Sequence, residues 1–141
     1  MRTLVISDLH LGAVARTDLA RRPELREPLL EALEQVDRLV VLGDVLELRE
    51  VPVRAAATHA EGFLRDVARA LGRGKQLVLV AGNHDHGLVA PWLDARLYDP
   101  DGAQLGLEHF FTPDEAGPLA RRMAEHAADT EVVLAYPGLF V

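Results

Sequence analysis

The sequence of 141 residues contains no cysteine. Disulfides, thiolate zinc sites and cysteine nucleophiles are therefore excluded, and any bound metal must use oxygen and imidazole ligands. No run approaches the roughly 20 apolar residues that cross a bilayer. Asp8 and His10 also interrupt the apolar N-terminal segment before it could serve as a signal peptide. We therefore expect a soluble, cytoplasmic protein without a membrane span.

Positive charge is also scarce, because 15 Lys and Arg stand against 22 Asp and Glu, which gives a formal net charge of −7 at pH 7. An acidic surface repels phosphate backbones, so stable nucleic-acid binding is not expected. The hydrophobic content of 49% and the length suit one compact domain, residues 1–141. The first apolar run lacks a following G-x-G-x-x-G, which disfavours a dinucleotide-binding domain.

Three short apolar runs predict strands that are buried on both faces, "TLVIS" at 3–7, "RLVVLG" at 38–43 and "QLVLVAG" at 76–82. Between them, apolar residues at helical spacing predict two helices, the second ended by "GRG" at 72–74. The helix over 23–36 would bury Leu25, Leu29, Leu30, Leu33 and Val36, and the helix over 56–71 would bury Ala56, Ala60, Phe63, Leu64, Val67 and Leu71. This β-α-β-α-β order predicts an α/β fold with a largely parallel sheet. The C-terminal ends of the strands then share one edge, and ligands bind at that edge in open α/β sheets.

The second half of the chain has weaker signals. "PWLDARLYDPDGAQLG" at 91–106 predicts a short helix or turn and then a loop, and "LGLEHFFTP" at 105–113 predicts a strand. A further helix is expected from Pro118 to Ala128, and "TEVVLAYPGLFV" at 130–141 predicts a last strand.

Polar side chains follow each of the first three predicted strands. They are Asp8 with His10, Asp44 with Glu47, and the run Asn83, His84, Asp85 and His86. Each interval matches one βαβ unit, so the three clusters should lie side by side. Carboxylates and imidazoles gathered at one edge would repel one another or stay unsatisfied unless a cation joined them. The pattern therefore predicts a site for two divalent metal ions.

The ligand types narrow the choice of metal. Mixed carboxylate, imidazole and amide donors without sulfur favour Mn²⁺, Fe, Co²⁺ or Zn²⁺ over an all-oxygen Ca²⁺ site. A bridging Asp44 would hold two ions about 3.5 to 4 Å apart, the spacing used for displacement at phosphorus. Gly43 and Gly82 leave room for a close approach of backbone and metal. Each motif alone also fits ordinary turn chemistry, including a left-handed Asn83, so the prediction rests on all three together.

"DLH", "GDVLE" and "GNHD" resemble the first three signature blocks, D-x-H, G-D-x-x-D/E and G-N-H-D/E, of the calcineurin-like metallophosphoesterase superfamily. The resemblance covers residues 3 to about 88 and implies an αββα sandwich, of which the βαβαβ portion here is the first half. Family members add later metal-binding histidines, one of them in a G-H-x-H block. After His86 this chain has only His109 and His126, outside that context, so we expect a C-terminally truncated domain.

The resemblance also implies roles for the metal ligands. Asp8 and His10 would bind the first ion, Asp44 would bridge the pair, and Asn83 would bind the second ion. The nucleophile would be a metal-bridging hydroxide. Without the later histidines, the second ion would have two protein ligands here, which leaves activity of the isolated chain as a separate question.

Two further residues are implied to act in catalysis. His84 would contact the scissile phosphate and protonate the departing oxygen, while Asp85 would orient its ring. Glu47, in the last place of the second block, would be a support. His86 is interpreted as a solvated turn residue.

The sequence therefore predicts an enzyme that hydrolyses phosphate mono- or diesters of a small molecule or nucleotide. The alternative is a non-catalytic metal-binding or interaction module, in which an exposed C-terminal strand pairs with another chain, including a second copy.

Overall fold

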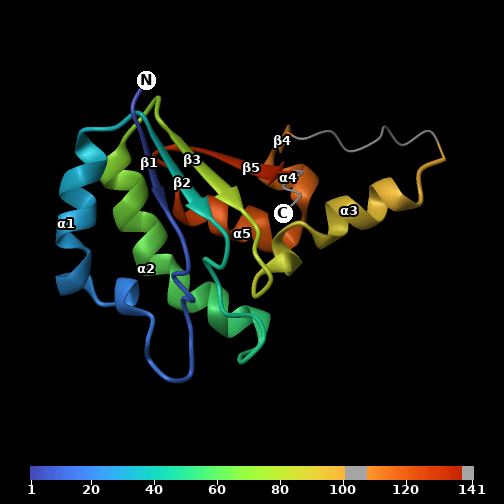
Figure 1. Ribbon diagram of the computed structural model, residues 1–141, viewed down its shortest axis with the longest axis horizontal. Coiled ribbons are helices and arrows are strands. Elements are labelled where there is room, and N and C mark those ends of the chain that lie inside the picture. The colour runs from blue at the N-terminus through green and yellow to red at the C-terminus, as the bar shows by residue number, and fades with distance from the viewer. Residues whose placement is uncertain (101–107, 138–141) are drawn as a thin grey trace.

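The structure is a computed structural model that describes residues 1–100 and 108–137. In this part of the chain, five strands form one sheet in the order β1-β2-β3-β5-β4 (Figure 1). The strands are β1 (Thr3–Ile6), β2 (Arg38–Leu42), β3 (Gln76–Val80), β4 (Glu108–Phe111) and β5 (Glu131–Pro137). The first three strands pair in parallel as predicted, β5 joins β3 in parallel, and β4 closes the sheet antiparallel to β5. The predicted α/β class with a largely parallel sheet is confirmed.

The helices of the described residues fill the connections between strands. They are η1 (Leu19–Arg21), α1 (Pro23–Glu34), α2 (Val53–Leu71), η2 (His86–Leu88), α3 (Ala90–Leu97), α4 (Pro113–Ala116) and α5 (Pro118–His126). Helices α1, α2 and α5 lie next to one another over one face of the sheet, while α3 projects away from the body (Figure 1). No helix in the described ranges is long and apolar enough to cross a membrane.

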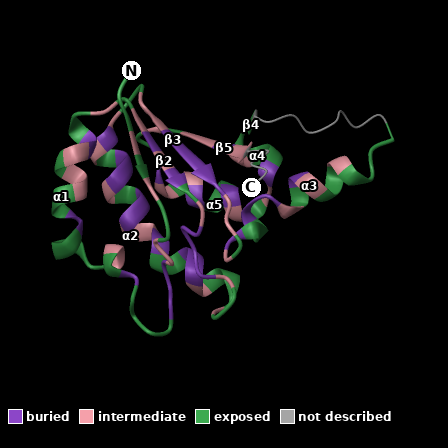
Figure 2. Cartoon of the chain, in the orientation of Figure 1, coloured by how far each residue is buried: buried purple, intermediate pink, exposed green. Residues whose placement is uncertain are grey.

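Helix α2 supplies most of the helical side of the core. The apolar residues that predicted it are all buried, namely Ala56, Ala60, Phe63, Leu64, Val67 and Leu71. They belong to one hydrophobic core with the buried strand residues Leu39, Leu77 and Leu134, and Figure 2 shows the buried parts of α2 beside the strands. The helix ends at Gly72, whose φ of 84° is a left-handed conformation that glycine adopts without steric cost. The predicted stop is thus confirmed.

Helix α1 differs from its prediction at one turn. Leu25 was expected on the buried side but is exposed, whereas the neighbouring Arg26 is buried. Arg26 Nη1 lies 2.7 Å from Asp66 Oδ2 on α2, and its Nη2 donates to the carbonyl of Arg21 at 3.0 Å. Because a buried guanidinium needs an anionic partner, Asp66 fixes which side of α1 faces α2.

The expectation that the strands are buried on both faces is confirmed for β3, where consecutive residues from Leu77 to Val80 are buried, but it is wrong for β1 and for the end of β2. Val5, Leu42 and Phe110 are 54%, 45% and 57% exposed, and the strand register places them on the sheet face opposite the buried Leu39 and Leu77. All three helices that cover the sheet lie on its other face, and residues 1–100 and 108–137 contain no second sheet. This open face is partly hollowed beside Phe110 and Tyr136, where a cavity of about 190 Å³ lies.

The C-terminal strand is not an edge of the sheet. β5 pairs with β3 through residues 131–135 and with β4 through residues 134–137, so it is an interior strand of the sheet. Oligomerisation through the C-terminal strand stays a prediction. Residues 138–141, which include the "GLFV" ending, lie outside the described residues.

Candidate metal centre

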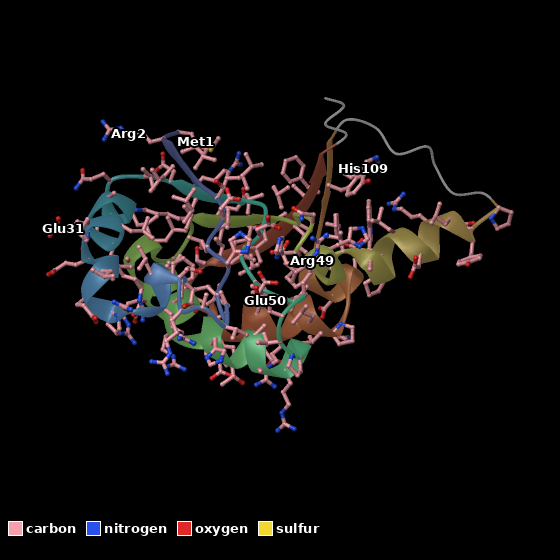
Figure 3. The ribbon with its side chains drawn as sticks, turned by 60° about the horizontal axis from the view of Figure 1, so that its bottom comes forward. Met1, Arg2, Glu31, Arg49, Glu50 and His109 are labelled. Carbon is pink, nitrogen blue, oxygen red and sulfur yellow. The ribbon has the colours of Figure 1, made fainter. Side chains whose placement is uncertain are left out.

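The loops that leave β1, β2 and β3 are held together by backbone hydrogen bonds beyond the strand ends. Asp8 N–H donates to the carbonyl of Gly43 at 3.2 Å, and His10 N–H donates to that of Asp44 at 2.9 Å. Gly43 N–H donates to the carbonyl of Val80 at 2.9 Å. The parallel pairing thus continues into the polar clusters and brings them to one edge, as predicted. Figure 3 shows Arg49 and Glu50 in the loop after β2, and Met1 and Arg2 at the other end of β1.

Asp8, His10 and Asp44 form a group of potential metal ligands. One ligand atom from each lies within 4.8 Å of the others, and His10 Nε2 is 4.0 Å from Asp44 Oδ2. Asp44 is buried, His10 is half-buried and Asp8 is exposed, so the group opens to solvent on one side. Two carboxylates and an imidazole at this distance suit a borderline divalent cation.

The backbone at these three residues is left-handed. The φ angles are 57° at Asp8, 45° at His10 and 53° at Asp44, and among the described non-glycine residues only Arg16 shares this conformation. An L-residue in the left-handed region is uncommon and costs free energy, which a fold tolerates chiefly at functional sites. The coincidence of strain with the predicted ligands therefore supports a functional centre at this edge.

Gly82 leaves the space that the Asp44 carboxylate occupies. A Cβ at position 82 would lie 2.7 Å from the amide nitrogen of Asp44 and closer still to its Oδ1. A Cβ on Gly43 would in turn lie 3.4 Å from the Cα of Gly82. Glycine was expected here for an approach of backbone to metal. In the structure it allows the β3 loop to pack directly against Asp44.

Glu47 holds two imidazole rings at once. Its Oε2 lies 2.7 Å from Nδ1 of His84 and 3.2 Å from Nδ1 of His10, and the two rings meet edge to face at 4.6 Å between centroids. The other oxygen, Oε1, accepts from Arg49 N–H at 2.9 Å. Burial alone would raise the pKa of Glu47, but these hydrogen bonds outweigh it and hold the pKa below its ordinary value. Glu47 is therefore an anion that fixes both rings.

A family model for calcineurin-like phosphoesterases matches residues 1–136. The chain belongs to this family. No curated protein matches the sequence. Membership indicates metal-dependent phosphoester hydrolysis and a hydrolase with a metal-binding site, consistent with the ligand groups in the structure. The family typically binds two divalent ions, and a phosphoester substrate fits it.

In this calcineurin-like phosphoesterase, Asp85 was expected to orient the ring of His84, but its hydrogen-bond partners are backbone N–H groups. Its carboxylate does not contact the His84 ring, because Oδ2 accepts from Val45 N–H at 2.7 Å and Leu46 N–H at 3.2 Å. Oδ1 accepts from Gly82 N–H at 2.7 Å. The fully buried Asp85 thus ties the β2 loop to the β3 loop. The ring partner of His84 is Glu47.

Burial raises the pKa of the Asp85 carboxyl above its ordinary value, against the three N–H donors, which lower it. The nearby charge of Asp44 adds a smaller rise. The surroundings of Asp85 therefore disfavour its ionised form, whereas those of Glu47, whose pKa is lowered, favour the ionised form.

His84 is joined to the centre by its backbone as well as its ring. Its N–H donates to Asp44 Oδ1 at 2.8 Å, and its carbonyl accepts from Leu48 N–H at 3.2 Å. His84 also forms a second group of potential ligands with His10 and Glu47. We interpret that group as a pair of rings on one carboxylate, because both Nδ1 atoms lie within hydrogen-bond distance of the same oxygen.

The remaining polar residues divide between the centre and the surface. Asn83 is exposed in the same loop, between Gly82 and His84, and its ligation of a second ion stays a prediction. His86 is exposed at the start of η2, as expected for a turn residue. His126 lies 3.4 Å from Glu61, and His109 lies beside Trp92, so in the described part of the chain neither joins the ligand groups.

The sequence reasoning named Glu47 as a support but missed that it contacts both histidines. The available signal was its place three residues after Asp44, which puts its side chain in the loop between the two other clusters. The path of the loops decides whether Glu47 or Asp85 reaches the imidazole. That path includes left-handed residues, which the sequence alone does not predict.

Proposed function

We propose that this domain hydrolyses phosphate mono- or diesters with two divalent ions. Asp8 and His10 would hold the first ion, Asp44 would bridge both, and Asn83 would bind the second. The single observation that carries this proposal is the meeting of Asp8, His10 and Asp44 ligand atoms within 4.8 Å at the strand-end edge. The donor set fits Mn²⁺, Fe, Co²⁺ or Zn²⁺. When bound, such ions lower the pKa of water and offset the charge of phosphate oxygens.

His84 is the proposed acid for the departing oxygen. Its Nδ1 faces the Glu47 carboxylate at 2.7 Å, so Nε2 is the ring nitrogen available to the substrate. In the proposed step the ring, acting as an imidazolium, would give its Nε2 proton to the leaving oxygen and keep the Nδ1 proton on the hydrogen bond to Glu47. Proton transfer then leaves a neutral ring whose tautomer is already fixed.

Glu47 takes the orienting role that the sequence analysis gave to Asp85. It acts through His84 and His10 and is therefore a positioning residue. Asp85 supports the site through the backbone of the β2 loop. The proposed substrate is a phosphorylated small molecule or nucleotide, as predicted from the sequence. The proposed location is the cytoplasm.

The test is hydrolysis of p-nitrophenyl phosphate and bis-p-nitrophenyl phosphate by the 141-residue chain with Mn²⁺, alongside calorimetric measurement of Mn²⁺ binding. Asp44→Ala should lose both binding and rate. His84→Ala should keep the metal and lose roughly 10² to 10⁴ in kcat, the usual contribution of a positioned acid. His86→Ala, two positions away and exposed, is the matched control and should keep both.

A rate that survives chelation would rule out the metal mechanism. Loss of Mn²⁺ affinity in His84→Ala would make His84 a ligand and overturn its role as the acid. If the chain bound Mn²⁺ but hydrolysed neither ester, the proposed catalysis would be wrong for this chain, and the proposed metal site would stand.

The open sheet face favours one alternative function, a metal-binding module that docks another protein surface. This face exposes three large apolar side chains, Val5, Leu42 and Phe110. Several exposed apolar residues on one face are more typical of an interaction surface than one such residue alone. Under this alternative the chain binds Mn²⁺, shows no esterase activity and elutes as an oligomer in size-exclusion chromatography. A monomer that turns over either ester would exclude it.

A further inference from the structure

A cavity of about 460 Å³ lies on the helical side of the molecule, between the start of α2, the η2 turn and the start of α5. Gly87 of η2 and Pro91 of α3 contribute to its wall. None of its lining residues belongs to the two ligand groups at the strand-end edge. It is therefore a separate site, and its volume lies in the range of small-molecule pockets, about 300 to 1,000 Å³.

The wall of this cavity is aliphatic. Val53 and Ala57 come from the first turns of α2, and Pro118 and Leu119 come from the start of α5. No aromatic ring is among the described residues that line it. Since flat aromatic ligands gain from stacking on aromatic side chains, a wall of methyl and methylene groups favours an alkyl chain.

The polar side chains on the wall are two arginines, Arg54 and Arg122, and no carboxylate among the described residues lines it. Arg122 Nη2 lies 3.0 Å from Glu61, but that carboxylate is shared with His126 at 3.4 Å. The Arg54 side chain makes no hydrogen bond or ion pair with the described residues. In a chain with net charge −7, Arg54 therefore places a positive charge at this mouth that no described carboxylate pairs.

We propose that the cavity binds a medium-chain fatty acyl carboxylate. The alkyl chain packs against Val53, Ala57 and Leu119, and the carboxylate pairs with Arg54 and Arg122 at the mouth. An aliphatic wall beside two guanidinium groups matches a ligand with one apolar body and one anionic head. A neutral chain would leave Arg54 without an anionic partner among the described residues, and a small anion would leave the aliphatic wall exposed to water. This assignment does not depend on the phosphoesterase proposal.

The test uses decanoate as the probe, with decanol and acetate as chain-only and head-only comparisons, on the metal-free protein. Methyl NMR should place decanoate against Val53 and Leu119 with one site per chain. Decanol and acetate should each bind at least about tenfold more weakly, because each lacks one half of the match. Absence of decanoate binding at millimolar concentration would overturn the proposal.

Three variants at two arginines of α2 separate binding in the cavity from an effect of general surface charge. Arg54→Ala should weaken decanoate binding about tenfold, and Arg54→Lys should restore part of it. Arg65→Ala, an exposed arginine of the same helix away from the cavity, is the matched control and should change nothing.

Three results would contradict binding of decanoate in this cavity. If Arg54→Ala and Arg65→Ala lost the same amount of decanoate affinity, binding would depend on net charge and not on this cavity. Methyl shifts at Val40 and Val80 would move the ligand to the open sheet face. A decanoate affinity that appears only when Mn²⁺ is added, and that Asp44→Ala removes, would assign the carboxylate to the metal centre. Failure of the esterase assay would leave this result unaffected.

Discussion

Helix α2 and the strand-end loops are built against the same sheet, but their backbones follow different rules. α2 runs for 19 residues with every predicted apolar position buried and ends at a glycine suited to that place. The loops contain three left-handed non-glycine residues, Asp8, His10 and Asp44, and buried carboxylates at Glu47 and Asp85. One region agrees with local preference throughout, and the other departs from it at successive positions.

The difference teaches where the molecule tolerates unfavourable local structure. A consistent helix stabilises the fold with no demand on its neighbours, whereas a left-handed aspartate persists only if surrounding contacts hold it. Here those contacts are the backbone hydrogen bonds between loops and the three N–H groups gathered by Asp85. The helical layer therefore supports the loops, and the loops hold the ligands.

The largest expected effect on stability comes from removing Asp85, which breaks the link between the loops. Asp85→Ala leaves the N–H groups of Val45, Leu46 and Gly82 without their acceptor in a buried place. We expect a loss of about 3 to 5 kcal/mol in the free energy of unfolding. Urea denaturation of the metal-free protein measures it. A loss below about 1 kcal/mol would mean that the loops do not depend on this carboxylate.

A somewhat smaller loss is expected where the loop backbones pack against each other. Gly82→Ala brings a Cβ to within 2.7 Å of the amide nitrogen of Asp44, and backbone cannot yield as a side-chain end can. The cost should be about 2 to 3 kcal/mol, with weaker Mn²⁺ binding because Asp44 must shift. Thermal and urea unfolding, together with calorimetry, test both parts. Unchanged Mn²⁺ affinity in a folded variant would contradict the second part.

The sequence predicted the regular region well because its signals are local. Helical spacing located α2 and α5, and continuous apolar runs located β1, β2 and β3 to within about two residues. The strand-end edge also followed, since two βαβ units with right-handed crossovers leave little freedom in where parallel strands end. Asp8, His10 and Asp44 could therefore be grouped before any coordinates.

What the sequence did not predict depends on partners far away in the chain. Arg26 is buried because Asp66, 40 positions later, meets it, and periodicity within α1 cannot report that. The open face of β1 follows from all three helices packing on the other side, which a strand's own residues do not determine. The hydrogen bond of the His84 ring to Glu47, with Asp85 bonded to backbone N–H groups, depends in the same way on the conformations of the loops.

A pH-dependent effect should distinguish the loop anion from ordinary surface carboxylates. The folded-state pKa of Glu47 lies below its ordinary 4.5, so its ionised form stabilises the fold. That contribution is fully present above the unfolded-state pKa and is lost as the pH falls through the lowered pKa. At pH 7, Glu47→Gln should cost about 1 to 2 kcal/mol.

The cost of Glu47→Gln should shrink as the pH is lowered below about 4.5, measured as the urea midpoint of metal-free protein. Glu31→Gln, an exposed carboxylate on α1, is the control and should show no such trend. A cost that grows toward acid would reverse the assigned direction of the Glu47 pKa.

The smallest effect is a gain, and it uses the same substitution in the regular region. Gly62 lies inside α2, where a Cβ would meet only the guanidinium of Arg26 at an ordinary 3.7 Å. Gly62→Ala removes the entropic cost of a glycine in a helix, so the free energy of unfolding should rise by about 0.5 to 1 kcal/mol. Measured beside Gly82→Ala, the identical change should thus have opposite signs in the two regions. If Gly62→Ala destabilised the protein as much as Gly82→Ala, the contrast between a locally consistent helix and strained loops would fail, because both glycines would then be fixed by packing alone.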